Sequence, residues 1–369
     1  MRSETVDLVY LDPPFYSKRG FYTKNGKQTV GFDDRWPGGI GEYTRWMSER
    51  LAESKRVLKK TGSIYVHCDP HASHYLKVAM DAIFGTSNFR NEIIWKRQSS
   101  HNDGRQGARH FGRIHDSILF FTKSRHYTWN PLFQPYSEGY VRKQYRHVGR
   151  KGRMYALGDL SGPSGTFKGN PVYKFMGIVR SWRYSKKKMK RLLREGKIVQ
   201  KRPGTVPQLK RYLDEMPGLP IQDVWTDITP ITSFSKERVA FPTQKPQTLL
   251  ERILLVSTNP GDLVVDPFCG CGSALIAAQN LRRRWVGVDI SHKACLIVKK
   301  RMSSVKAKAR VIDLRKIAGT APSLSKSDAP VRGYDKVVAN TRFPGLWLSR
   351  RLSGRLEFDM PVPPAPKAS

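Results

Sequence analysis

The sequence contains little cysteine, few acidic residues and no long apolar run. Its 4 cysteines among 369 residues are too few and too unevenly spaced for a disulfide framework, which favours reduced thiols in a cytoplasmic protein. No run of about 18 apolar residues occurs, which argues against a membrane span or a membrane partner. Acidic residues within positions 1–7 interrupt the apolar stretch that a secretory signal requires. Apolar residues still form 39% of the chain, enough for a folded core.

The shortage of acidic residues leaves a large positive charge that is unevenly distributed. The 66 Lys and Arg residues outnumber 30 Asp and Glu residues, for a formal net charge of +36. Residues 142–215 carry +17 and residues 299–369 carry +11, so the remainder carries only +8. Aromatic residues are interleaved with the cations of the middle segment. Cations that meet phosphates and rings that stack on bases predict a nucleic-acid partner, with a solvated basic surface as the alternative.

Strand and helix patterns alternate at both ends of the chain and fade in the middle. Short apolar runs predict strands at 6–11, 63–67, 92–95, 117–122, 263–266 and 285–289. Periodic apolar positions predict helices at 42–60, 73–84, 185–195, 208–215, 246–258, 273–281 and 292–302. This alternation predicts one α/β fold, a doubly wound, mostly parallel Rossmann-like sheet with a basic insertion.

The turn Asp12-Pro13-Pro14-Phe15 follows the first predicted strand, at the sheet edge where open α/β sheets bind ligands. Two consecutive prolines fix a rigid turn that offers backbone carbonyls and lacks amide donors. The Asp12 carboxylate and the Pro13 carbonyl match the two hydrogens of an exocyclic amine, and Phe15 offers a flat surface for a ring. The motif predicts a holder for an amino-purine or amino-pyrimidine, with an ordinary strand-ending turn as the alternative.

A second turn, rich in glycine, connects a predicted strand to a predicted helix over residues 266–273. Gly270 and Gly272 allow a ligand to approach the backbone closely. Asp289, at the end of the next strand, is placed to accept hydrogen bonds from a ribose diol. Because phosphate-binding motifs are absent from the sequence, we expect a ligand with a nucleoside and no phosphate, or else a structural turn. The two cysteines of this turn are too close for a zinc pair, so we expect no metal site.

Together these segments resemble the site-specific DNA amino-methyltransferases that use S-adenosylmethionine. The order is the permuted one, in which the catalytic motif precedes the cofactor motif. The likeness extends from Val6 to about Met302 and is dense, besides the two motifs, in 62–69, 88–95, 243–246 and 260–262. Asp-Pro-Pro-Phe is similar to the adenine-N6 form of the catalytic motif, whereas cytosine-N4 enzymes usually carry Ser in place of the Asp.

The resemblance implies transfer of a methyl group from S-adenosylmethionine to adenine N6 in specific sites of double-stranded DNA. The target base would be flipped out of the duplex and held by Asp12, Pro13, Pro14 and Phe15. The residues implied for the cofactor are Lys245, Asp266, Phe268, Gly270, Gly272, Ser273 and Asp289. Among them, Lys245 would bind the methionine carboxylate and Asp289 the ribose hydroxyls.

The resemblance also divides the chain. Residues 1–95 would be the catalytic half of the methyltransferase domain and 231–317 its cofactor-binding half, while 96–230 would be the basic target recognition insertion. Residues 318–369 are expected to form a basic tail without regular structure. DNA contacts are expected from the basic positions of the insertion, with packing of its own core as the alternative for the segment around Trp182. These positions are Arg183, Lys186, Lys187 and Lys188.

Two alternatives to adenine methylation remain, a cytosine-N4 methyltransferase and a catalytically impaired DNA-binding remnant. The second arises because, in much of the family, a strand with a Gly-Asp turn precedes the catalytic strand and touches the cofactor. Only Met1–Thr5 precede Val6 here, and residues 309–314 are the candidate substitute at the sheet edge. A restriction–modification or phage system, with its cognate restriction endonuclease, is the implied setting in a prokaryotic or phage-encoded protein. A homodimer is left open.

Overall fold

The computed structural model describes residues 1–25, 28–99, 107–162, 169–239, 241–313 and 336–340. The chain divides into two compact units. The sheet unit comprises Met1–Asn130 and Asp223–Ser369, and the insert unit comprises Pro131–Gln222. The insert unit is narrower than the 96–230 insertion because the flanking segments 115–122 and 224–225 pair with strands of the main sheet.

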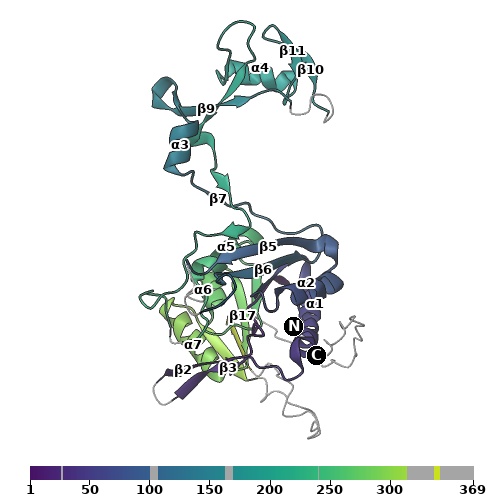
Figure 1. Cartoon of the computed structure of the whole chain (residues 1–369), viewed down its shortest axis with the longest axis vertical. Coiled ribbons are helices and arrows are strands. Elements are labelled where there is room, and N and C mark those ends of the chain that lie inside the picture. Colours follow the sequence, from purple (N-terminus) through teal and green to yellow (C-terminus); the bar gives the residue numbers. More distant parts are fainter. Residues whose placement is uncertain (26–27, 100–106, 163–168, 240, 314–335, 341–369) are drawn as a thin grey trace. The chain divides into compact units, whose positions relative to one another are not determined.

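A sheet of nine described strands forms the centre of the sheet unit, in the order β15-β5-β6-β4-β1-β16-β17-β19-β18 (Figure 1). Its strands are β1 (Val6–Leu11), β4 (Leu58–Cys68), β5 (Phe89–Lys96), β6 (His115–Thr122), β15 (Val224–Trp225), β16 (Leu263–Asp266), β17 (Arg284–Asp289), β18 (Ala309–Asp313) and β19 (Lys336–Asn340). Among them, β6 and β19 run antiparallel to their neighbours, and the others share one direction. The predicted mostly parallel α/β sheet is confirmed.

Helices cover both faces of this sheet (Figure 1). One face carries α1 (Gly39–Val57) and α2 (Ser73–Phe84), and the other carries α5 (Gln247–Ser257), α6 (Ser273–Asn280) and α7 (His292–Ser304). Side chains alternate between the two faces along each strand. Val9 of β1 packs into the core that contains α1 and α2, whereas the Tyr65 hydroxyl of β4 reaches Ser257 of α5 on the other face at 2.7 Å. Within the described residues, no helix combines the length and apolarity that a bilayer crossing requires.

The insert unit has a core of its own. Four antiparallel strands lie in the order β12-β13-β9-β8, and the pairs β10-β11 and β14-β7 complete the unit. Its elements are β7 (Phe133–Gln134), α3 (Glu138–Gln144), β8 (His147–Val148), β9 (Met154–Asp159), β10 (Val172–Phe175), β11 (Ile178–Ser181), α4 (Lys186–Arg194), β12 (Ile198–Val199), β13 (Gln208–Tyr212) and β14 (Leu219–Pro220). Trp182 is fully buried in this core against Phe175 and Met189, so it packs the unit.

Three features differ from the sequence expectations. Residues 208–215, predicted as a helix, form β13 and a short 3₁₀ turn, because pairing with β9 overrides their weak helical pattern. A hairpin of β2 (Gly20–Asn25) and β3 (Gln28–Asp33) was not predicted. The segment 318–369, expected to lack regular structure, contributes β19 between β17 and β18, and the rest of it lies outside the described residues. The predicted edge strand at 309–314 is confirmed as β18.

Candidate active site

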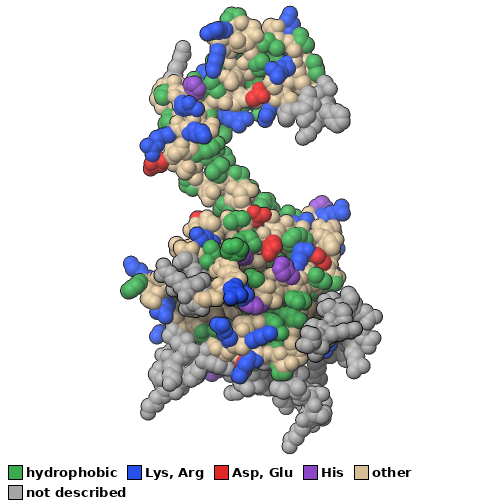
Figure 2. All heavy atoms as spheres, viewed as in Figure 1, with side chains coloured by type: hydrophobic (Ala, Val, Ile, Leu, Met, Phe, Trp, Pro, Cys, Tyr) green, Lys and Arg blue, Asp and Glu red, His purple; other side chains and the backbone are tan. Residues whose placement is uncertain are grey.

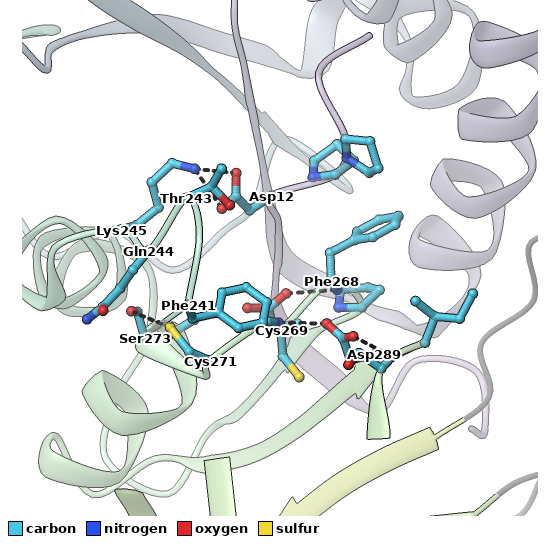
Figure 3. Close-up of a pocket in the computed structure, with 18 of the residues that line it drawn as sticks. Asp12, Phe241, Thr243, Gln244, Lys245, Phe268, Cys269, Cys271, Ser273 and Asp289 are labelled. Atoms are coloured by element: carbon cyan, nitrogen blue, oxygen red, sulfur yellow. Dashed lines mark hydrogen bonds and ion pairs between the residues drawn. The ribbon is translucent and has the colours of Figure 1, made fainter. Parts of the chain in front are cut away.

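The carboxyl ends of β1, β16 and β17 meet at one edge of the sheet and line a pocket of about 430 Å³. The pocket brings together ten of the predicted site residues, namely Asp12, Pro13, Pro14, Phe15, Lys245, Asp266, Phe268, Gly270, Ser273 and Asp289. Gly272 does not line the pocket and instead shapes the turn beneath it. Figure 3 shows Asp12 with Lys245 on one side and Asp289 beside the glycine-rich turn on the other.

Asp12 and Lys245 form an ion pair within this pocket. Asp12 follows β1 and Lys245 precedes α5, and the Lys245 Nζ lies 2.7 Å from each oxygen of the Asp12 carboxylate (Figure 3). The same Nζ lies 4.9 Å from the centre of the Phe15 ring. Lys245 was expected on the cofactor's methionine carboxylate, whereas here it neutralises the predicted catalytic carboxylate.

The turn that carries Asp12 is held from two sides. The Tyr43 hydroxyl of α1 donates to the Pro14 carbonyl at 2.7 Å. The buried carboxylate of Asp34 accepts from the backbone amides of Tyr16 at 3.1 Å and Ser17 at 2.6 Å. These contacts fix the chain immediately after Asp12, so the carboxylate and the neighbouring prolines are preorganised.

A buried polar chain lies behind Phe15, and the sequence did not indicate its role. The Phe15 ring stacks on the His67 imidazole at 5.7 Å between centroids and 23° between planes. The His67 ring nitrogens lie 2.9 Å from the Tyr10 hydroxyl and 3.1 Å from Asp116, which also pairs with Arg97 at 2.8 Å.

The electrostatics of this chain favour an ionised Asp116. Burial raises the pKa of Asp116, but the hydrogen bond from His67 and the charges of His67, Lys245 and Arg97 outweigh burial and leave that pKa below its ordinary value. The Asp116 carboxylate therefore provides a fixed charged partner for His67. His67 lies in segment 62–69, which the family resemblance had marked without assigning the residue a role.

The glycine-rich turn requires glycine at two positions. Gly270 has φ +48° and Gly272 has φ +80°, values that residues with a Cβ adopt at a steric penalty. A Cβ on Gly272 would lie 2.7 Å from Val298, and a Cβ on Gly270 would lie 3.0 Å from Phe241. The turn is therefore packed closely against Val298 and Phe241, and Gly270 lines the pocket.

Asp289 holds this turn from the neighbouring strand. Its carboxylate accepts from the Gly270 amide at 2.8 Å and the Ser291 amide at 2.7 Å. Burial raises the pKa of Asp289 to about 6, although both hydrogen bonds act to lower it. Burial also raises the pKa of Asp266 well above its ordinary value, and the nearby Asp12 and Asp289 raise it further. Clustered carboxyl groups of this kind suit a ligand with cationic and hydroxyl groups.

The thiols of the turn are structural. Burial raises the pKa of both Cys269 and Cys271, so the thiols remain protonated. Across the described residues, no group of three or more His, Cys, Asp or Glu side chains is arranged to hold a metal ion.

The four predicted DNA-binding residues belong to the insert unit, around α4. Ser185 caps α4, which buries Met189 and Leu192 and leaves Lys186, Lys187 and Lys188 exposed. Arg183 is also exposed, and its Nε donates to the Ser161 carbonyl at 2.9 Å. On the face seen in Figure 2, lysine and arginine side chains recur over this unit and acidic ones are few.

Known proteins match this sequence over most of its length. A family model described as DNA methylase matches residues 6–300. The chain is 32% identical over 308 residues to the Type II methyltransferase M.EcaI of Enterobacter cloacae, covering 82% of this chain and 66% of the relative. It is 26% identical over 293 residues to the DNA adenine methyltransferase YhdJ of Escherichia coli K12, covering 78% of this chain and 73% of the relative.

A third relative is the Mod subunit of the Type III restriction-modification enzyme StyLTI of Salmonella typhimurium, 26% identical over 314 residues and 76% of this chain. The chain spans between 47% and 73% of the length of these three relatives. Because the family model covers most of the sequence and contains both site motifs, the chain belongs to the DNA methylase family.

Proposed function

We propose that the protein transfers a methyl group from S-adenosylmethionine to the N6 amine of adenine in specific sites of double-stranded DNA. The observation that supports this most strongly is the shared pocket, in which the rigid Asp12 turn faces the glycine-rich turn and Asp289. The printed names of the relatives, among them a DNA adenine methyltransferase, agree with this activity.

The groups present fit this cofactor. Asp266 and Asp289 supply carboxyl groups for its cationic and hydroxyl parts, and Gly270 lines the pocket beside them. Phe241 and Ile290 line the same pocket and provide apolar surface for a base. The residues that would hold the cofactor are therefore those of the glycine-rich turn, Asp289 and Lys245.

S-adenosylmethionine supplies an electrophilic methyl group carried on a sulfonium. The Asp12 carboxylate and the Pro13 carbonyl accept the two hydrogens of the adenine amine, which favours a pyramidal nitrogen with its lone pair directed at the methyl carbon. After transfer the nitrogen carries one extra proton, which Asp12 is placed to accept. Phe15, backed by His67, offers a stacking surface for the flipped base. The rate enhancement comes from positioning and preorganised acceptors.

Lys245 lines the pocket together with both the Asp12 turn and the glycine-rich turn. Its Nζ contacts both oxygens of Asp12. Lys245 would also be the residue that holds the methionine carboxylate of the cofactor, while Asp12 would accept the adenine amine.

The insert unit is proposed to recognise the target sequence. It carries 21 Lys and Arg against 5 Asp and Glu residues, a net charge of +16 over 131–222. Such an excess of cations suits phosphate contacts along a duplex. A restriction–modification system with a cognate endonuclease is the proposed setting, by analogy with the names of the relatives.

The activity is tested by incubating DNA with the purified protein and S-adenosylmethionine and identifying the methylated nucleosides by mass spectrometry. We expect N6-methyladenine, and an Asp12→Ala variant should lose activity by a factor on the order of 10² to 10³ while still binding cofactor. Asp81→Ala, on α2 outside the pocket, is the matched control and should retain activity. Detection of N4-methylcytosine alone would replace adenine by cytosine as the target, and absence of any methylation would favour a DNA-binding remnant.

A further inference from the structure

Two phenylalanine rings of the sheet unit are almost fully exposed. Of the large hydrophobic side chains that the structure describes, Phe111 and Phe234 are the most exposed, at 98% and 96%. Phe111 lies on the connection between β5 and β6, flanked by Arg109 and Arg113. An aromatic ring in water between two cations suits a partner that offers both a stacking surface and negative charge, as a nucleic acid does.

The segment that carries Phe111 is fixed to the sheet. The Ile114 carbonyl accepts from the amides of Arg97 at 2.9 Å and Gln98 at 3.2 Å. Arg113 reaches across to His71 at 2.9 Å, and His71 in turn contacts Asp69 at 2.8 Å. The end of this connection, at Arg113 and Ile114, is thus tied to the start of the same connection and to the residues that follow β4.

This attachment places Phe111 at the same edge of the sheet as the proposed catalytic turn. Leu11 at the end of β1 pairs with Val66 of β4, and Cys68 of β4 pairs with Ser117 of β6. With neighbouring strands about 4.8 Å apart and about 3.3 Å per residue along a strand, the start of β6 lies roughly 16 Å from the end of β1, two strands across and four residues further along. Phe111 precedes His115 by four residues, a reach of up to roughly 13 Å. A duplex whose target base occupies the Asp12 pocket would therefore lie along the edge of the sheet that carries this ring.

We propose that Phe111 inserts into the DNA duplex at the position vacated by the flipped adenine. The inference rests on the proposed function of the Asp12 pocket. The ring stacks on the base pairs beside the gap and offsets part of the cost of extruding the base. The exposed Arg109, two residues earlier, would meet the phosphates that flank the gap.

The test compares two duplex substrates, one with the target adenine paired to thymine and one with it opposite an abasic site. Their sequence is taken from the sites that the protein modifies in DNA of its expression host. For Phe111→Ala, kcat/KM on the paired substrate should fall roughly tenfold. On the abasic substrate the loss should be less than about twofold, because extrusion is already easy there. Phe111→Trp should restore most of the activity on the paired substrate.

Phe234→Ala is the matched control, since it removes an equally exposed ring from a different connection. It should leave the ratio between the two substrates unchanged. Equal losses on both substrates for Phe111→Ala, or no loss on either, would overturn the proposal and would leave a protein partner as the reason for the exposed ring.

A second readout requires no methyl transfer. With 2-aminopurine at the target position, wild-type protein should raise the fluorescence as the base leaves the stack, and Phe111→Ala should reduce this rise. If wild-type protein extrudes the base but transfers no methyl group, the proposed activity fails while the role of Phe111 stands. If both proteins extrude it equally, the role of Phe111 fails while the activity stands.

Discussion

At the scale of single residues, the main electrostatic contact inside the pocket is the ion pair between Asp12 and Lys245. The two residues are 233 positions apart in the chain, and both oxygens of Asp12 contact the Lys245 ammonium at 2.7 Å. An exposed pair would contribute little, but Lys245 is buried, so loss of either partner leaves the other charge without compensation. The neighbouring carboxyl groups, Asp266 and Asp289, have pKa values raised mainly by burial.

Replacement of Lys245 should weaken cofactor binding. We expect Lys245→Met to raise the Kd for S-adenosylmethionine at least about tenfold, the size of a lost hydrogen bond between charged groups. Isothermal titration calorimetry measures this directly, and Lys299→Met on exposed α7 surface is the control. An unchanged Kd would show that Lys245 serves Asp12 alone.

Cofactor affinity should depend on pH through Asp289. Because burial raises the pKa of Asp289 to about 6, the carboxyl is protonated below that pH and charged above it. The cationic cofactor should bind more tightly as the pH rises from 5 to 7, and Asp289→Asn should remove the part of this change centred near 6. Calorimetric titration across this range checks the prediction, and an unaltered pH profile in the variant contradicts it.

The raised pKa of Asp289 affects the stability of the fold in the opposite direction, because stability decreases where cofactor affinity rises with pH. The pKa of Asp289 in the folded protein lies above its unfolded value of about 3.9. The folded state therefore binds more protons between these two values, so the contribution of Asp289 to the free energy of unfolding decreases as the pH rises from about 4 to about 6. This contribution is constant above that window.

At the scale of elements, the site is formed by the turns that follow the carboxyl ends of β1, β16 and β17. The glycine-rich turn between β16 and α6 could be predicted because its constraints are local, namely a strand end, two glycines and a helix start. The role of His67 could not be predicted, since its partners Tyr10, Phe15 and Asp116 come from other elements. The strand β13 was misread as a helix for a related reason, because only its pairing with β9 determines its conformation.

Gly272→Ala should destabilise the sheet unit. The substitution places a Cβ at φ +80°, 2.7 Å from Val298 of α7, and the left-handed conformation alone costs about 1–2 kcal/mol. Urea denaturation should show a lower free energy of unfolding. Gly41→Ala in α1, where a Cβ meets nothing within 4 Å, should be neutral or slightly stabilising. Equal stability of the two variants would contradict the steric account.

At the scale of the whole molecule, charge and chemistry are divided between the two units. The sheet unit contains the complete pocket, while the insert unit carries a net charge of +16 in 92 residues. The charge distribution of the sequence predicts a basic insertion at 96–230, and the insert unit lies within these limits. The charge distribution carries no information on which strands pair with each other. The segments 115–122 and 224–225 belong to the main sheet because they form hydrogen bonds with strands that are distant in the sequence.

Replacement of the exposed α4 lysines should reduce DNA binding and its salt dependence together. For wild-type protein with about 6 neutralised phosphates, the slope of log K against log salt concentration should be near −5. Changing Lys186, Lys187 and Lys188 to Gln should reduce the magnitude of this slope by up to about 3. The control changes three lysines of α7 to Gln, namely Lys293, Lys299 and Lys300. Equal effects of both triple variants would mean that net charge, and not α4, determines binding.

The most direct measurement of the central claim is a map of modified bases in DNA from a host that lacks its own DNA methylation. Expression of the wild-type chain should produce N6-methyladenine at one short recurring sequence, and expression of the Asp12→Ala variant should produce none. Modified cytosine at that sequence, no modification at all, or unchanged modification in the Asp12→Ala variant would contradict the account.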